Sequence, residues 1–147
     1  MGLLDRLRGT AGGRRVGLYV DGPNVLRDEF DVDLDEVRAL ASEEGSVAMA
    51  RLYLDEHATP ELIKAAEARG FEVVTTSGDV DVRLAVDATA AVTGELLDVL
   101  VVVSRDADFK PVLERAAGQG VKTVAVAPGS YGRSDALRNA AQRATTL

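Results

Sequence analysis

The 147-residue sequence has no cysteine, no tryptophan and a single histidine, His57. Without cysteine there is no disulfide framework, thiolate zinc site or cysteine nucleophile, and a protein of the reducing cytoplasm is expected. One histidine excludes any metal site with two histidine ligands. Aromatic residues make up only 4% of the chain, so the sequence does not indicate a platform on which nucleic-acid bases stack.

Long apolar runs are also absent. The longest run, Val99 to Val103, is far shorter than the roughly 18 residues of a membrane-spanning helix, and the first residues lack the apolar core of a signal peptide. Residues 1–15 carry four arginines against one aspartate. We expect a flexible basic leader over 1–15, with a functional basic arm as the alternative, one domain over 16–147, and no membrane association.

Positive charge is scarce. The chain has 17 lysines and arginines against 24 aspartates and glutamates, which gives a formal net charge of −7. Proteins that bind nucleic acid without sequence preference usually present a basic face, because lysine and arginine neutralise phosphates. The composition therefore predicts weak intrinsic affinity for nucleic acid, unless bound cations offset part of the acidic charge.

From residue 16 onward, short valine-rich runs alternate with helical patterns. Five runs predict strands, at 16–20, 47–54, 71–76, 99–103 and 121–127. Five helices are predicted, at about 34–44, 60–69, 82–93, 109–117 and from Ser134 onward. Most strand runs are apolar on both faces, as in a parallel sheet between helices. The pattern predicts a Rossmann-like, three-layer α/β/α sandwich with a mainly parallel sheet of about five strands.

Ligands of open α/β sheets bind beyond the carboxyl ends of the strands, where this chain places polar residues. Asp21 and Asn24 follow the first predicted strand, and Asp106 follows the fourth. Parallel neighbours lie about 4.8 Å apart, so Asp21 and Asp106 come close if their strands are adjacent. Two such carboxylates repel each other unless a cation lies between them. Oxygen ligands without cysteine or histidine favour Mg²⁺ or Mn²⁺, ions that serve reactions of phosphate esters.

A third acidic segment surrounds the start of the third predicted helix. Asp81 and Asp87 lie there and would form the opposite wall of a metal site. Simpler roles are open for several of these residues: helix capping for Asp81 or Asp108, an ion pair with Arg83 for Asp87, and a turn for Asn24.

Other phosphate and acyl chemistries lack their motifs. The chain has no Walker A sequence, no G-x-G-x-x-G after the first strand and no G-x-S-x-G. A phosphate-accepting aspartate at the end of the first strand remains an alternative, although the segment DGPN does not match the DxDxT pattern of phosphatases.

Four blocks of the sequence resemble the NYN domain, a branch of the PIN-like nucleases, and small archaeal NYN proteins look most similar. The blocks are VGLYVDGPN (16–24), GDVDVRLAVDA (78–88), VVVSRDADFKPVLERAAGQGVKTVAV (101–126) and SDALRNAA (134–141). They stand in the family's order and span nearly all of residues 16–147. The resemblance implies a PIN-like fold with a metal-dependent, RNA-cleaving site.

The resemblance also matches individual residues of this sequence to positions in the family's motifs. Asp21 and Asn24 match the family's strand-one pair, Asp81 and Asp87 its helix carboxylates, and Asp106 and Asp108 its S-G-D-x-D-F block. Arg105 stands where that block has glycine. It either contacts a phosphate or narrows the access and lowers the activity.

We therefore predict a Mg²⁺- or Mn²⁺-dependent ribonuclease that acts on single-stranded RNA, with a protein partner or a second copy of the chain as further partners. The predicted catalytic residues are Asp21, Asn24, Asp81, Asp106 and Asp108. The predicted metal ligands are Asp21, Asp81, Asp87, Asp106 and Asp108. The predicted phosphate contacts are Ser104, Arg105, Arg83, Lys110, Arg133 and Arg138. The alternatives are an RNA- or protein-binding module without turnover, and a phosphatase for small substrates.

Overall fold

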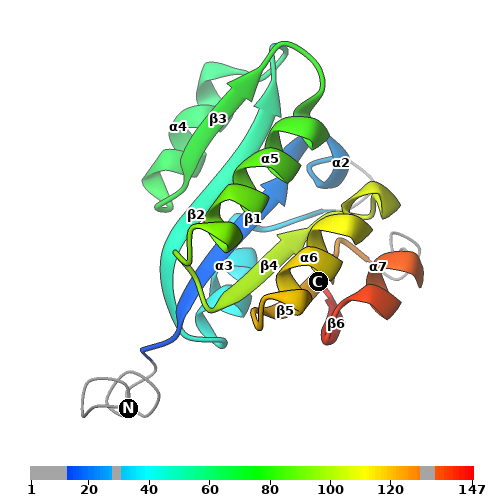
Figure 1. Ribbon diagram of the computed structural model, residues 1–147. Coiled ribbons are helices and arrows are strands. Elements are labelled where there is room, and N and C mark those ends of the chain that lie inside the picture. The colour runs from blue at the N-terminus through cyan, green and yellow to red at the C-terminus, as the bar shows by residue number, and fades with distance from the viewer. Residues whose placement is uncertain (1–12, 28–30, 130–134) are drawn as a thin grey trace.

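The computed structural model describes residues 13–27, 31–129 and 135–147. Its centre is a sheet of six parallel strands in the order β3-β2-β1-β4-β5-β6 (Figure 1). The strands are β1 (Arg15–Asp21), β2 (Ser46–Asp55), β3 (Glu72–Thr76), β4 (Val99–Val103), β5 (Lys122–Ala127) and β6 (Arg143–Thr146). The predicted α/β class and the parallel sheet are confirmed.

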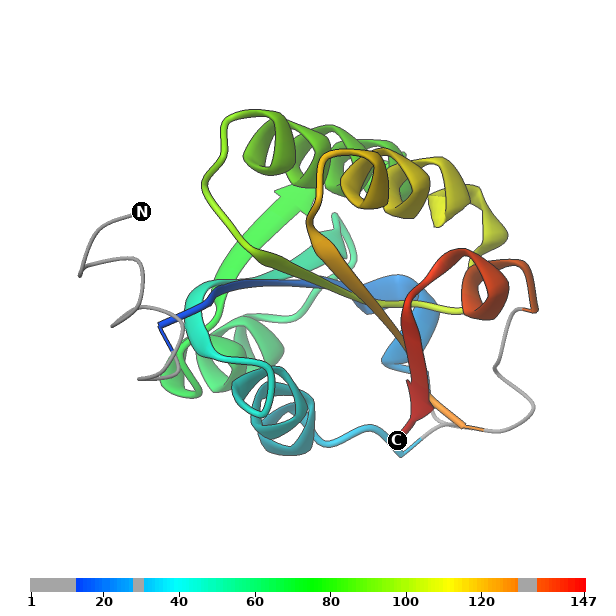
Figure 2. The same cartoon turned by 60° about the horizontal axis from the view of Figure 1, so that its bottom comes forward.

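Helices cover both faces of the sheet (Figure 2). They are α2 (Gly22–Val25), α3 (Leu34–Ser42), α4 (Pro60–Ala68), α5 (Val80–Thr93), the 3-10 turn η2 (Ala107–Phe109), α6 (Lys110–Gly118) and α7 (Asp135–Ala140). The apolar residues of α3 and α4 share one core with the sheet, whereas those of α5, α6 and α7 share the other. The three layers of the predicted sandwich are therefore present. Within the described ranges, no helix is long and apolar enough to cross a membrane.

The two central strands, β1 and β4, are buried because their side chains pack into the apolar cores on both faces of the sheet. In β1, Leu18 and Val20 pack toward α3 and α4, while Tyr19 packs toward α5. All five residues of β4 are buried. Strands that are apolar on both faces are stable only between two helix layers, which is why the valine-rich runs predicted this architecture.

The strand order creates the place where a site can form. From β1 the chain moves outward through β2 and β3, and then crosses back to place β4 on the other side of β1. The loops that leave β1 and β4 therefore diverge at the carboxyl edge of the sheet. Such a reversal of strand order leaves a crevice in which α/β proteins bind ligands.

The carboxyl-terminal segment differs from the sequence prediction. The helix expected from Ser134 onward is described from Asp135 and ends at Ala140, and a sixth strand, β6, follows it. This strand is four residues long, pairs only with β5 and is partly exposed. An edge strand this short carries too few residues for a clear period, and its pairing with β5 outweighs the helical tendency of the alanines nearby.

The first strand and the residues after it also differ from the sequence prediction. A single helical turn, α2, follows β1 where a turn was expected, and β1 itself begins at Arg15, the last residue of the expected leader. Residues 1–12 of that leader and the predicted phosphate contact Arg133 lie outside the described residues.

A buried ion cluster ties the amino ends of β5 and β6 to the end of α3. Glu44 is 8% exposed, and its carboxylate accepts hydrogen bonds from the Lys122 Nζ at 2.7 Å and from the Arg143 guanidinium. Burial raises the pKa of Glu44, but the hydrogen bonds and charges of the two cations outweigh burial and hold the pKa below its ordinary value. The cluster anchors the edge of the sheet that lies opposite the crevice.

We predict that Glu44→Gln lowers the free energy of unfolding by about 1–3 kcal/mol near pH 7, because two cations lose a buried partner. Because the pKa of Glu44 is lower in the folded protein than its ordinary value of 4.5, the ionised carboxylate stabilises the folded state at pH values above 4.5. This stabilisation is lost as the pH falls through the folded-state pKa. Urea unfolding near pH 7 and near pH 3 measures both effects, and the cost should shrink at the lower pH.

Glu43→Gln is the matched control, because Glu43 also pairs with Arg143, at 3.7 Å, but its side chain is 60% exposed. Its cost should stay below about 0.5 kcal/mol. Equal costs for the two variants, or an undiminished cost of Glu44→Gln near pH 3, would contradict the assignment.

Candidate functional site

Asp21 and Ser104 join the carboxyl ends of the two central strands. Asp21 is the last residue of β1 and is 4% exposed, while Ser104 follows β4 and is 2% exposed. The Ser104 Oγ donates a hydrogen bond to the Asp21 Oδ2 at 3.2 Å. Because β1 and β4 are neighbours in the sheet, the residues at their carboxyl ends are in contact where the two loops begin to diverge.

Hydrogen bonds fix the loop after β4. The Arg105 N–H donates to the Asn24 Oδ1 at 2.9 Å, which ties the loop to α2. The Asp106 N–H donates to the Ser104 Oγ at 3.0 Å, and the Asp108 N–H donates to the Asp106 Oδ1 at 2.9 Å. The hydrogen bond from the Asp108 N–H to the Asp106 side chain caps η2. The backbone of the loop is therefore held in one shape, with its acidic side chains at the crevice.

Three carboxylates from two segments converge beside this loop. One oxygen each of Asp81, Asp106 and Asp108 lies within 4.8 Å of the other two. Asp81 comes from the first turn of α5, and the other two come from the loop and η2. Asp81 and Asp106 are partly buried, whereas Asp108 is exposed. Carboxylate oxygens at this spacing suit a hard divalent cation such as Mg²⁺ or Mn²⁺.

The same carboxylates perturb Asp21. The pKa of Asp21 is raised to about 6. Burial is the largest cause and the negative charges of Asp106 and Asp81 contribute, while the hydrogen bond from Ser104 opposes the rise. The ionised form of Asp21 is thus disfavoured in the protein without metal. A cation at this position would remove the conflict, because its charge stabilises every carboxylate around it.

An open cavity of about 310 Å³ holds most of these groups. The described residues that line it include Asp21, Asn24, Asp81 and Asp106, together with three residues outside the predicted set, Arg27, Asp55 and Asp79. Asp55 ends β2 as Asp21 ends β1, so the strand-end rule applied to β2 would have found it. Asp79 adopts a φ of 49°, a left-handed conformation that aspartate tolerates better than most residues.

Asp87 lies apart from the three-carboxylate group and has other partners. The Tyr53 hydroxyl donates to its Oδ2 at 2.8 Å, and Arg83 and Arg51 form ion pairs with it at 3.1 and 3.9 Å. Burial, together with the hydrogen bond to Asp87, raises the pKa of Tyr53, so its hydroxyl stays a donor. These contacts hold α5 against β2, and the ligand role of Asp87 stays a prediction.

The predicted phosphate contacts are spread over the molecule. Arg105 is partly buried within the loop, Lys110 is exposed at the start of α6, and Arg83 pairs with Asp87. Arg138 on α7 lines a second cavity, which Ser104 also lines. Arg27 is the one cation among the described residues that line the acidic cavity.

Comparison with known proteins explains this arrangement. Residues 15–147 match the NYN domain family. The chain belongs to the NYN domain family. The resemblance of the four sequence blocks is therefore confirmed. An NYN domain with this cluster of carboxylates fits a nuclease of the PIN-like superfamily, whose members use divalent metals.

One curated protein and one solved structure are similar to this NYN domain. The chain is 41% identical over 139 residues to an uncharacterized protein of Methanocaldococcus jannaschii, and the match covers 95% of this chain and 58% of that protein. The chain thus spans little more than half the length of this curated relative. The crystal structure of a protein of unknown function from Vibrio parahaemolyticus has a similar fold, with a TM-score of 0.78 and 21% sequence identity. The structural match covers 91% of this chain and 93% of the Vibrio chain.

We predict that Asp21→Asn stabilises the metal-free NYN domain near pH 7 by about 1–3 kcal/mol. A folded pKa raised from 3.8 to about 6 means that ionisation of Asp21 costs stability as the pH rises through this interval, and the neutral amide removes that cost. Urea unfolding with a chelator present, near pH 4 and near pH 7, measures the difference.

The stabilisation should be small near pH 4, where the wild-type carboxyl is protonated in the folded state. Glu67→Gln, the same kind of change at an exposed carboxyl on α4, serves as the control and should alter the free energy of unfolding by less than about 0.5 kcal/mol. A loss of stability near pH 7, or an equal gain at both pH values, would show that the folded protein does not disfavour the ionised form of Asp21.

Proposed function

We propose that this NYN domain is a Mg²⁺- or Mn²⁺-dependent ribonuclease that hydrolyses phosphodiester bonds of single-stranded RNA at the acidic crevice. The observation that carries the proposal is the convergence of Asp81, Asp106 and Asp108 beside the buried Asp21. The cavity there is open, so a polymer can reach it without a change of the fold. The absence of cysteine leads us to place the protein in the cytoplasm.

The donor set fits a divalent metal. Asp81, Asp106 and Asp108 would hold it through carboxylate oxygens, with Asp21 at the buried side of the cavity. When bound, such an ion lowers the pKa of a coordinated water and stabilises the charge on the leaving oxygen. An ion held by these aspartates would keep water among its ligands, because Mg²⁺ in proteins usually retains several waters.

Other residues of the chain position these groups. Ser104 holds the Asp21 carboxylate by its hydroxyl, and Asn24 holds the loop that carries Asp106. In the proposal Asn24 also orients the attacking water or a phosphate oxygen. Arg27 gives the cavity a cation for the phosphate, and Arg105 and Lys110 flank the loop on either side of the aspartates.

The net charge of the chain then has a local explanation. Several of the 24 acidic residues gather at the crevice, and bound cations would offset their charge. RNA would bind weakly without metal, because the crevice repels phosphate when its carboxylates are bare. The affinity for RNA should therefore depend on metal as strongly as the cleavage does.

We predict that the protein cleaves a short fluorescent single-stranded RNA with Mn²⁺ or Mg²⁺ and that a chelator stops the cleavage. Asp106→Asn should lower kcat/KM by at least about 100-fold, because a carboxylate beside the reacting phosphate is lost. Asp35→Asn is the matched control, because the Asp35 side chain is 68% exposed on α3 and does not line the acidic cavity. It should keep activity within about twofold. Asp87→Asn tests the predicted ligand role of Asp87.

Denaturing gels measure cleavage, and calorimetry with Mn²⁺ measures metal binding by the same variants. Undiminished cleavage by Asp106→Asn, or in excess chelator, would remove the proposed chemistry. A large loss of Mn²⁺ affinity in Asp87→Asn would return Asp87 to the ligand set.

A module that binds RNA or protein without turnover is the second candidate. The observation that favours it is Arg105, a partly buried arginine in the loop where the family's block has glycine. Wild-type protein that binds Mn²⁺ and RNA but leaves the RNA intact would decide for this candidate. Recovery of cleavage in Arg105→Gly would then identify the arginine as the cause.

A further inference from the structure

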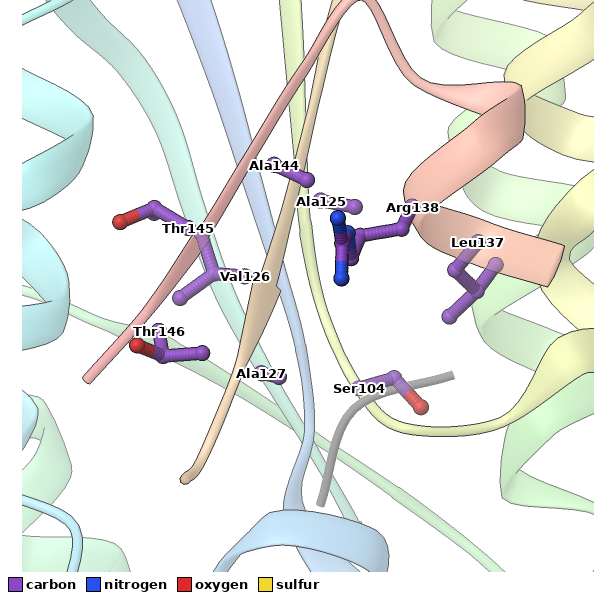
Figure 3. A pocket seen from close by; sticks show the side chains of 9 residues that line it. All are labelled: Ser104, Ala125, Val126, Ala127, Leu137, Arg138, Ala144, Thr145 and Thr146. Atoms are coloured by element: carbon purple, nitrogen blue, oxygen red, sulfur yellow. The ribbon is translucent and has the colours of Figure 1, made fainter. Parts of the chain in front are cut away.

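A second cavity of about 310 Å³ lies at the carboxyl ends of β5 and β6, against α7 (Figure 3). Six of the residues that line it carry the argument: Ser104, Ala125, Ala127, Leu137, Arg138 and Ala144. Its volume is at the lower end of the range for cavities that bind small molecules, about 300–1,000 Å³. The space is large enough for a ligand of nucleotide size.

Small side chains on the sheet keep this space open. The register pairs Ala125 with Ala144 and Ala127 with Thr146, and these four residues lie on the same face of β5 and β6. On the neighbouring strand β4, the larger Val102 is paired with Ala125 and belongs to the buried core. Ala125 and Ala127 are buried, whereas Ala144 is exposed on the edge strand, and larger side chains at these positions would occupy the space.

The charge at the cavity favours an anion. Figure 3 shows the Arg138 side chain extending from α7 toward β5, beside Ala125. Among the residues that the structure describes, no ion pair joins Arg138 to a carboxylate, and no aspartate or glutamate lines this cavity. In a chain with more acidic than basic residues, a cavity with arginine and without acid is suited to phosphate.

Ser104 connects this cavity with the acidic crevice. It lines the second cavity, and its Oγ donates to the Asp21 Oδ2, which faces the first. The two cavities therefore lie on either side of one buried serine at the same edge of the sheet. A single strand of RNA that crosses this edge can place one phosphate at the aspartates and a neighbouring nucleotide at Arg138.

We infer that the second cavity binds the nucleotide next to the cleaved bond. Arg138 contacts its phosphate, and its sugar and base lie against Ala125, Ala144 and Leu137. The inference rests on the proposed ribonuclease function for its biological role, whereas the binding of a nucleotide at this place can be measured without cleavage or metal.

The probe is adenosine 5′-monophosphate, titrated into the full chain with a chelator present and followed by heteronuclear NMR. The amide signals of Ala125, Ala144 and Leu137 should shift. Arg138→Ala should weaken binding at least about tenfold, because the phosphate loses a charged hydrogen-bond donor. Ala144→Leu should do the same by filling the cavity. Arg115→Ala, at an exposed arginine on α6 that does not line the cavity, should bind as the wild type does.

Cleavage of RNA separates the two proposals. Arg138→Ala should raise the KM for RNA by about tenfold and leave kcat within about twofold, and its affinity for Mn²⁺ should not change. Unaltered binding of the monophosphate in both Arg138→Ala and Ala144→Leu, or shifts confined to other surfaces, overturns the inference even if the protein cleaves RNA. Absence of cleavage by the wild type refutes the ribonuclease, while the titration still decides what the cavity binds.

Discussion

The hydrogen bond between Ser104 and Asp21 depends on one topological fact, the adjacency of β1 and β4. Parallel strands end at one edge of the sheet, and a reversal of strand order between neighbours opens a crevice at that edge. The valine-rich strands supply the burial that holds β1 and β4 together. Ser104 then connects the strands to the loop, because its Oγ also accepts from the Asp106 N–H. This contact therefore fixes two of the crevice carboxylates, Asp21 and Asp106, relative to each other.

Two buried carboxyl groups at opposite edges of the sheet show how the chain distributes its charge. Burial raises the pKa of both, but Glu44 faces two cations and its pKa is lowered overall, whereas Asp21 faces two carboxylates and its pKa is raised. The first arrangement stabilises the fold at neutral pH, and the second costs stability in the absence of metal. Uncompensated charge of this kind is common where a protein binds or reacts, because the fold alone gives no reason to retain it.

The sequence was sufficient for the central strands, since apolar runs bounded by helix caps have few other interpretations. It was insufficient for β6, whose four residues become a strand only by pairing with β5. The strand-end rule found Asp21 and would have found Asp55 if applied evenly. Asp81 and Asp87 were grouped by proximity in sequence, yet six residues turn an α-helix by about 600°, which leaves the two about 120° apart around its axis. Helical geometry therefore predicts that they face different partners, as the contacts of Asp87 show.

Net charge describes this chain poorly, because charge acts over distances of about 10 Å or less at moderate ionic strength. One cavity at the carboxyl edge gathers aspartates, and its neighbour across Ser104 has arginine and no acidic lining residue among those described. A phosphate approaching this edge therefore meets repulsion or attraction according to position and to the presence of metal. In the proposed function, the protein would in this way select where along an RNA strand the phosphates lie, because the cavity of Arg138 would accept an anion before a cation binds at the aspartates. The scarcity of lysine and arginine over the whole chain is compatible with a polyanionic substrate once the charges are placed.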